Sequence, residues 1–247
     1  MRILVTAKVV LEPEALPVVA CGKLKTAGAK RVIDQLDEAI LQAAIDMKHA
    51  ISATKVTAAS VGAGADRDVL KLSLAMGADE AVLLKLSNAS ANALTVAKLI
   101  KRLVALENYE LVLVGSQSSD NEGSQVGQAL ASLLGWPHLS KVTKLEWCSE
   151  GYFRARCSID RGNVWFLVRR PCVMVCDARI AKPKLLKLSG LVEAKKKKVK
   201  VKAVANLNLR SCASLSEAKY SIPEIERKRQ VFADLKSAQA ALMECLK

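Results

Sequence analysis

The sequence predicts an α/β protein with a parallel sheet and flanking helices, followed by an antiparallel extension and a C-terminal arm. Hydrophobic residues make up 51% of the 247 residues and aromatic residues only 4%. The core must therefore be built from Ala, Val, Leu and Ile, which typically fill parallel sheets covered by helices. In the first 115 residues, short apolar runs alternate with stretches of helical periodicity. This alternation is typical of strands joined by crossover helices.

The parallel strands are predicted at residues 3–10, 56–61, 81–84 and 111–114. A helix is predicted at residues 33–50 because Leu36, Ile40 and Met47 recur at helical spacing. Asp66 can cap a shorter second helix, and a third is expected around residues 96–103. Each predicted helix thus follows a predicted strand.

The pattern changes after residue 114. A polar loop at 115–124 leads into a helix at 125–134, which Gly135 is expected to end. Residues 142–147, 152–159 and 164–168 are expected to be antiparallel strands, and residues 172–176 a buried strand. Beyond residue 177 regular alternation is lost until a helix at 231–246.

These patterns predict three segments. Residues 1–180 are expected to form the α/β domain, residues 181–204 a docking loop with a basic strand, and residues 205–247 a C-terminal arm. The arm lacks enough periodic apolar surface for its own core, so we expect it to wrap a partner.

Composition limits the classes of function. The net charge of +14 favours encounter with acidic partners or polyanions. The sequence has no aromatic RNA-binding motif and no zinc-finger spacing, so nucleic-acid binding is the less favoured alternative, which would predict steeply salt-dependent binding. No apolar run approaches the length of about 20 residues that spans a bilayer, so we expect no membrane insertion.

The cysteines indicate a reducing compartment. They number seven and show no C-x-x-C spacing. The first residues enter a strand pattern at once, which leaves no room for a signal peptide. We expect a protein of the mitochondrial matrix if the source is eukaryotic, or of the cytoplasm if it is bacterial.

No catalytic constellation is present in the sequence. The only histidines, His49 and His138, are too few for a His-based metal site and have no nucleophile at a motif position. We therefore expect no catalytic residues and no metal.

The polar loop after the strand at 111–114 is the strongest local signal. A strand that leads through Gly and Ser into a helix amino terminus presents backbone N–H groups and the positive end of a helix dipole, which suits a phosphate. An ordinary capped loop remains the alternative, because no Walker or G-x-G-x-x-G fingerprint is present.

This loop resembles the nucleotide-binding loop of electron transfer flavoprotein beta subunits. The matching loop residues are Gln117, Asp120, Gln125, Gly127 and Gln128. Further matches follow in the same order: Ala7-Lys8, Leu-Ala-Met-Gly-Ala-Asp at 74–79, Trp136-Pro137, Cys-Asp-Ala-Arg at 176–179, and Ala-Lys-Lys-Lys-Lys-Val at 194–199. Together they span nearly the whole chain.

The resemblance implies a Rossmann-like sheet of the adenine-nucleotide-binding type that holds AMP, with FAD mostly on the alpha subunit. A related branch of the family binds a second FAD here, but Gln128 favours AMP. The AMP contacts implied by position are Thr6, Asp34, Gln35, Leu36, Asp37, Val61, Ser118, Ser119, Asp120, Asn121, Glu122, Gly123, Ser124, Gln125 and Val126.

The resemblance also implies the partners: the electron transfer flavoprotein alpha subunit, acyl-CoA and related dehydrogenases, and a quinone oxidoreductase. Leu188 matches the Leu with which the family docks on dehydrogenases, although a short amphipathic turn would explain residues 182–193 as well. The lysines Lys195, Lys196, Lys197 and Lys198 would steer acidic partners or simply form a solvated face. The alternative function is a stand-alone adenine-nucleotide-binding sensor without a redox role.

Overall fold

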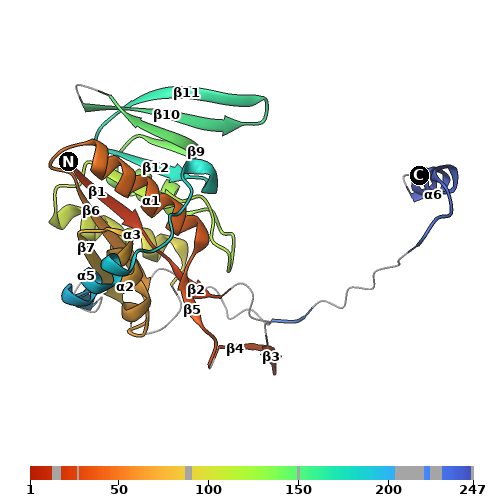
Figure 1. Cartoon of the computed structure of the whole chain (residues 1–247), viewed down its shortest axis with the longest axis horizontal. Coiled ribbons are helices and arrows are strands. Elements are labelled where there is room, and N and C mark those ends of the chain that lie inside the picture. Colours follow the sequence, from red (N-terminus) through yellow and green to blue (C-terminus); the bar gives the residue numbers. More distant parts are fainter. Residues whose placement is uncertain are drawn as a thin grey trace. The chain divides into compact units, whose positions relative to one another are not determined.

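The structure is a computed structural model that describes residues 1–12, 18–26, 28–86, 91–148, 151–203, 220–222 and 230–245 (Figure 1). The chain divides into two compact units. The larger unit comprises residues 1–16 and 26–217, and the smaller comprises residues 17–25 and 218–247.

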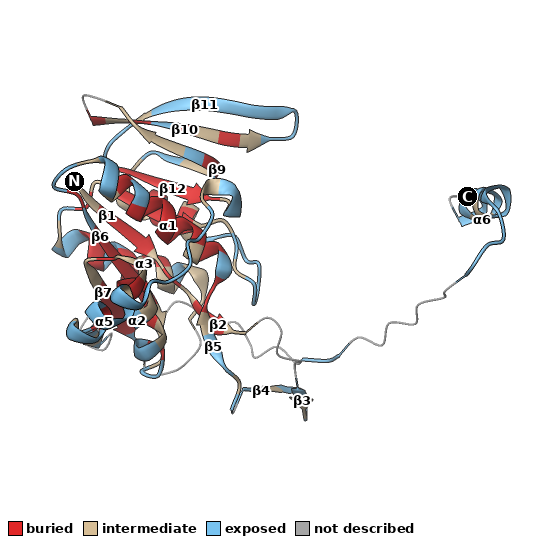
Figure 2. Ribbon diagram, in the orientation of Figure 1, coloured by how far each residue is buried: buried red, intermediate tan, exposed pale blue. Residues whose placement is uncertain are grey.

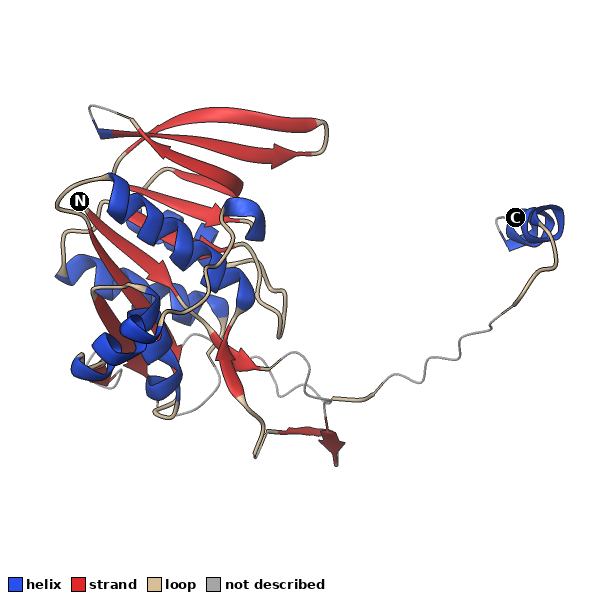
Figure 3. Cartoon of the chain, in the orientation of Figure 1, coloured by secondary structure: helices blue, strands red, loops and turns tan. Residues whose placement is uncertain are grey.

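A nine-stranded sheet forms the centre of the larger unit (Figure 3). Its order is β11-β10-β9-β12-β8-β1-β6-β7-β13. The strands are β1 (Arg2–Thr6), β6 (Lys55–Gly62), β7 (Glu80–Lys85), β8 (Leu111–Gly115), β9 (His138–Trp147), β10 (Tyr152–Ile159), β11 (Gly162–Arg169), β12 (Cys172–Cys176) and β13 (Lys200–Ala203). All neighbouring pairs are parallel except β9–β10 and β10–β11. The Rossmann-like α/β class predicted from the sequence is confirmed.

Helices cover both faces of this sheet. One face packs against α1 (Gln35–Ala50), α2 (Asp66–Met76) and α5 (Leu188–Lys196). The other face packs against α3 (Ala93–Leu106) and α4 (Val126–Leu134). The central strands are buried on both sides, as Figure 2 shows, which explains why they are continuous apolar runs in the sequence.

Side chains at the helix ends place the helices relative to the loops. Asp34 caps α1 by accepting the N–H of Leu36 at 3.0 Å, and Asn92 caps α3 by accepting the N–H of Thr95 at 2.8 Å. Gly135 ends α4 in the left-handed region, with φ of 67°, which glycine adopts without steric cost.

Several elements differ from the sequence predictions. The run 3–10 is two strands, because the chain leaves the sheet after Thr6 and forms β2 (Val9–Leu11), which pairs with β5 (Arg31–Ile33). Ile33 therefore belongs to a strand, and the first helix begins at Gln35 rather than at residue 33. The loss of regular structure expected beyond residue 177 is wrong as well. The short 3-10 helix η2 (Ala178–Ile180), α5 and β13 lie there, the last paired with β7.

The smaller unit contains the ribbon of β3 (Val18–Ala20) and β4 (Lys23–Lys25), and α6 (Leu235–Cys245). The N–H of Tyr220 donates to the carbonyl of Gly22 at 2.9 Å. No residue of α6 is buried, and Leu235 is 85% exposed. Most of the predicted arm, at 204–219, 223–229 and 246–247, lies outside the described residues. Among the residues described, none of the helices combines the length and the apolar character needed to cross a bilayer.

Candidate functional site

A cavity of about 430 Å³ opens at the carboxyl ends of three parallel strands. Thr6 ends β1, Gly62 ends β6 and Gly115 ends β8, and all three residues line the cavity. Strand β1 lies between β6 and β8, where the chain reverses the direction in which it adds strands. Such switch points are the usual ligand sites of open α/β sheets, and the volume lies in the range of about 300–1,000 Å³ of small-molecule pockets.

The cavity walls differ in polarity. The apolar lining comes from β6, β8 and the region of α3 and α4: Val61, Leu86, Val96, Ile100, Val114 and Val126. The charged lining comes from the chain beside β1 and from the first turns of α1 and α2: Lys8, Arg31, Asp37 and Asp66. One apolar wall and one charged wall suit an amphipathic ligand that carries both a ring and a charged group.

The polar loop between β8 and α4 is tied to the start of α1. The Asp34 carboxylate accepts both the backbone N–H and the hydroxyl of Ser119, each at 2.7 Å, besides capping α1. Asp34 is only 3% exposed, so these bonds are shielded from water. The loop is therefore fixed by a residue 85 positions earlier in the chain.

Asp37 is the most perturbed titratable group of the cavity. Burial, reinforced by the neighbouring Asp34 carboxylate, raises the pKa of Asp37 from 3.8 to about 8, against the lowering effect of the Lys8 N–H that it accepts at 2.7 Å. At neutral pH its carboxyl is thus mostly uncharged. It would not repel an anionic ligand, and it could donate a hydrogen bond.

The side chain of Lys8 bridges the first strand to the loop. Its Nζ lies 2.5 Å from Oδ1 of Asp120 and donates to Oγ of Ser118 at 3.0 Å. Partial burial raises the pKa of Asp120, but the hydrogen bonds from Lys8 and Ser118 outweigh it, so the net shift is downward. Asp120 is therefore ionised and held by Lys8 at neutral pH.

Three further residues in the cavity wall were missed by the sequence analysis as ligand contacts. Arg31 lies 2.9 Å from Oδ1 of Asp66, and Asp66 also accepts the N–H of Ala63 at 2.8 Å. The hydroxyl of Ser60 is buried and has no hydrogen-bond partner among the residues described. These side chains meet only through folding, so no local motif signalled them.

Glycine allows two close approaches around the cavity. A Cβ on Gly115 would lie 2.7 Å from Oδ1 of Asp37, and a Cβ on Gly127 would lie 2.5 Å from Cγ2 of Val175. The first brings the end of β8 onto the buried carboxyl, and the second seats α4 on the sheet. The amino end of α4 has no side-chain cap, so its first N–H groups are available to an anion.

The structure brings most of the predicted AMP contacts to the cavity. Those that line it are Thr6, Asp37, Val61, Ser118, Asp120, Asn121, Gly123, Ser124, Gln125 and Val126. Those that do not line it are Asp34, Gln35, Leu36, Ser119 and Glu122. Asp34 and Ser119 support the loop from behind through their mutual bonds. AMP binding itself stays a prediction.

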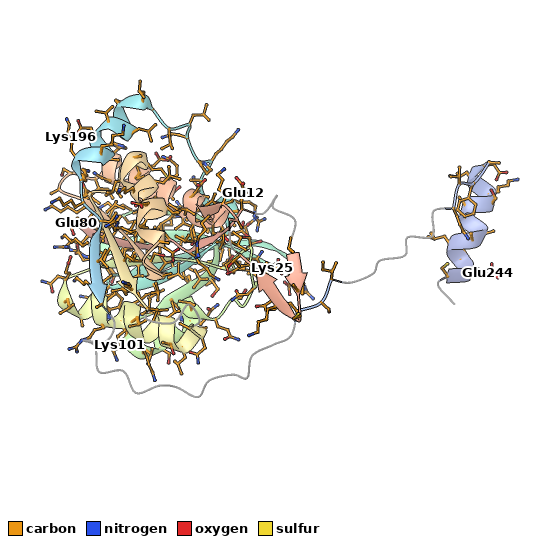
Figure 4. All side chains as sticks on the ribbon, turned by 90° about the horizontal axis from the view of Figure 1, so that it is seen from below. Glu12, Lys25, Glu80, Lys101, Lys196 and Glu244 are labelled. Carbon is orange, nitrogen blue, oxygen red and sulfur yellow. The ribbon has the colours of Figure 1, made fainter. Side chains whose placement is uncertain are left out.

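The predicted docking residues lie on and after α5. Leu188 begins α5 and is 77% exposed. Lys195, Lys196 and Lys198 are exposed and Lys197 is half-buried, with its Nζ donating to the carbonyl of Ala78 at 3.1 Å. Figure 4 shows Lys196 at the surface of the protein. The segment therefore offers an apolar side chain beside a basic rim.

Metal chemistry finds no support in this part of the structure. Within the described ranges, no three His, Cys, Asp or Glu side chains are grouped to hold a metal ion.

The fold and the cavity define a Rossmann-like α/β protein with a ligand-sized cleft at the switch point of its sheet. A profile of the Electron transfer flavoprotein domain matches residues 21–207. The chain is 31% identical to the electron transfer flavoprotein subunit beta of Bradyrhizobium diazoefficiens over 201 residues, covering 81% of this chain and 80% of the relative. For the subunit beta of Dictyostelium discoideum the identity is 31% over 186 residues, with coverages of 75% and 74%.

A third relative, from Arabidopsis thaliana, is named as a mitochondrial electron transfer flavoprotein subunit beta and is 31% identical over 212 residues, with coverages of 85% and 84%. The chain therefore belongs to the electron transfer flavoprotein family, on the side of its beta subunits. It is an electron-transfer subunit rather than an enzyme, as the sequence resemblance predicted.

Proposed function

We propose that this chain pairs with an electron transfer flavoprotein alpha subunit to form a heterodimer. The heterodimer carries electrons from flavin dehydrogenases, such as acyl-CoA dehydrogenases, to a downstream quinone oxidoreductase. FAD is held mostly by the alpha subunit. This chain supplies an AMP site and the surface that docks on the dehydrogenase, and it works in the mitochondrial matrix or, in a bacterium, in the cytoplasm.

The cavity at the switch point is the observation that supports the AMP site. Its apolar wall, with Val61, Val96 and Ile100, suits an adenine ring. The uncapped amino end of α4 and the cation of Lys8 suit a monophosphate. The buried hydroxyl of Ser60 supplies a polar group that a ribose or base can satisfy.

The exposed segment around Leu188 supports the docking role. A large apolar side chain that water surrounds on its own subunit becomes favourable when a partner pocket covers it. The neighbouring lysines form a positive rim that would speed encounter with an acidic dehydrogenase.

The test is to express the chain alone and together with the alpha subunit of the same organism, and to purify both preparations. We expect a one-to-one complex with flavin absorbance, from which denaturation releases AMP that mass spectrometry identifies. A flavin-free monomer that ignores the alpha subunit but retains AMP would overturn the carrier role and favour the stand-alone nucleotide sensor.

The AMP site can be tested separately from assembly. Ser60→Ala removes the unpartnered hydroxyl at little structural cost, because the wild-type group makes no internal hydrogen bond among the described residues. We expect less AMP per complex with unchanged flavin content. Unchanged AMP content in this variant would remove Ser60 from the site.

A further inference from the structure

The hairpin of β10 and β11 leaves an apolar surface open to solvent. We define the hairpin surface as Ile159, Val164 and Phe166, which are 47%, 37% and 41% exposed. In Figure 1 the hairpin extends beyond the helices that cover the central strands, and Figure 2 shows β11 exposed along most of its length.

This surface continues the hydrophobic core. Val164 pairs with Cys157 and Phe166 pairs with Ala155 across the antiparallel ladder, so each pair shares one face of the sheet. Cys157 and Ala155 are buried in the core beneath β10. The core face therefore runs on to β11 without a cover over its last strand.

The edge of β11 is also unprotected. Among the described strands β11 pairs only with β10, so its outer edge carries unpaired backbone groups. Residues 164–168 carry no charge, whereas β13 at the opposite edge carries Lys200 and Lys202. Lysine is a common means of preventing unwanted pairing at an edge, so an edge without it is expected to have a partner.

The charges of the hairpin argue against a second copy of this chain as that partner. Residues 152–170 contain five arginines and a single acidic residue, Asp160. On the reverse face Arg154 lies 4.3 Å from the ring centre of Trp165. Self-pairing would bring two such arginine sets together, and the chain as a whole carries +14. A different chain with an acidic rim is the complementary occupant.

From the apolar face, the open edge and the arginine rim together, we infer that the hairpin surface is where the companion alpha subunit packs. This inference rests on the heterodimer of the proposed function. It adds a second contact to the one expected from the C-terminal arm, and this contact is built on the rigid sheet. A buried aromatic anchor such as Phe166 is the kind of residue that dominates interface affinity.

The test measures affinity between the full-length chain and the alpha subunit of the same organism by biolayer interferometry. Phe166→Asp places a charge in the surface, and Leu94→Asp is the matched control, because Leu94 is 42% exposed on α3. We expect Phe166→Asp to weaken binding at least about ten-fold and Leu94→Asp to change it less than about two-fold. In the wild-type complex, hydrogen exchange at residues 163–168 should slow relative to the free chain.

A folding defect would not obscure the answer. If Phe166→Asp fails to fold, Val164→Thr/Phe166→Thr keeps β-forming residues while removing apolar area, and it should still weaken binding. A complex that forms normally with that variant, with exchange at 163–168 unchanged, overturns the inference alone. A wild-type chain that does not bind the alpha subunit overturns the proposed function. A chain that dimerises by itself through Phe166 shows that the occupant is a second copy.

Discussion

The buried carboxyl of Asp37 makes a quantitative prediction about stability. Its pKa is about 8 in the folded chain and is expected near its ordinary value of 3.8 in the unfolded chain. Between these values the folded state holds a proton that the unfolded state releases. The contribution of Asp37 to the free energy of unfolding therefore falls as pH rises from about 4 to about 8, and it is constant outside that range.

Each pH unit within this window corresponds to about 1.4 kcal/mol. Asp37→Asn removes the titration but keeps an oxygen that can accept the N–H of Lys8. We expect the stability of the variant relative to the wild type to grow with pH, by up to about 4 kcal/mol between pH 5 and pH 8. Other groups titrate in both proteins, so their contributions cancel in the difference.

Urea denaturation of the nucleotide-free chain at pH 5, 6, 7 and 8 measures this difference directly. The midpoints of variant and wild type should separate progressively across the series. A difference that stays constant from pH 5 to pH 8 would refute the reasoning. It would mean that Asp37 is solvated or paired well enough in the folded chain to ionise normally.

Three further predictions follow from single contacts. Lys8→Met removes the partner that lowers the pKa of Asp120, so the variant should lose up to about 1 kcal/mol at pH 7, and this loss should disappear as pH falls below about 4; denaturation at the two pH values measures it. Gly127→Ala drives a methyl to 2.5 Å from Val175, which should cost about 1–3 kcal/mol in thermal denaturation. Leu188→Ala should weaken binding to the dehydrogenase about ten-fold in a binding titration.

Matched controls separate these effects from general damage. Lys8→Arg keeps the cation and should retain most of the stability at pH 7. Gly123→Ala adds a methyl whose nearest neighbour is Oδ1 of Asn121 at 3.6 Å, so it should leave the melting temperature almost unchanged. Leu185→Ala removes another exposed leucine, 96% exposed, outside α5. Equal losses in a variant and its control would contradict the assigned contact.

Most of the sheet could be predicted because its central strands are buried on both faces. Such strands are continuous apolar runs, and 56–61, 81–84 and 111–114 each fall inside an observed strand. The ribbons between residues 9 and 33 escaped detection because their strands have only three residues each. Alternation over three residues does not rise above chance, and their pairing depends on contacts distant in sequence.

The site was predictable where it is local in sequence. The loop at 115–125 follows a strand and precedes a helix, and that order marks it. Ser60, Arg31 and Asp66 carry no such mark, because their neighbourhood arises from three elements that meet at the sheet edge. Asp66 could be interpreted from sequence only as a helix cap, whereas in the structure it accepts from Ala63 and pairs with Arg31.

The two proposed interaction surfaces lie at opposite edges of one sheet. Strands β11 and β13 are the first and last of nine, so about 38 Å separates them at the usual strand spacing. The segment around Leu188 precedes β13, and its helix α5 packs on α2. An alpha subunit held at the β11 edge would therefore leave this segment free for a dehydrogenase, as a carrier requires. Because the surfaces share no residue, Phe166→Asp should weaken only the first partnership and Leu188→Ala only the second, with additive effects in the double variant.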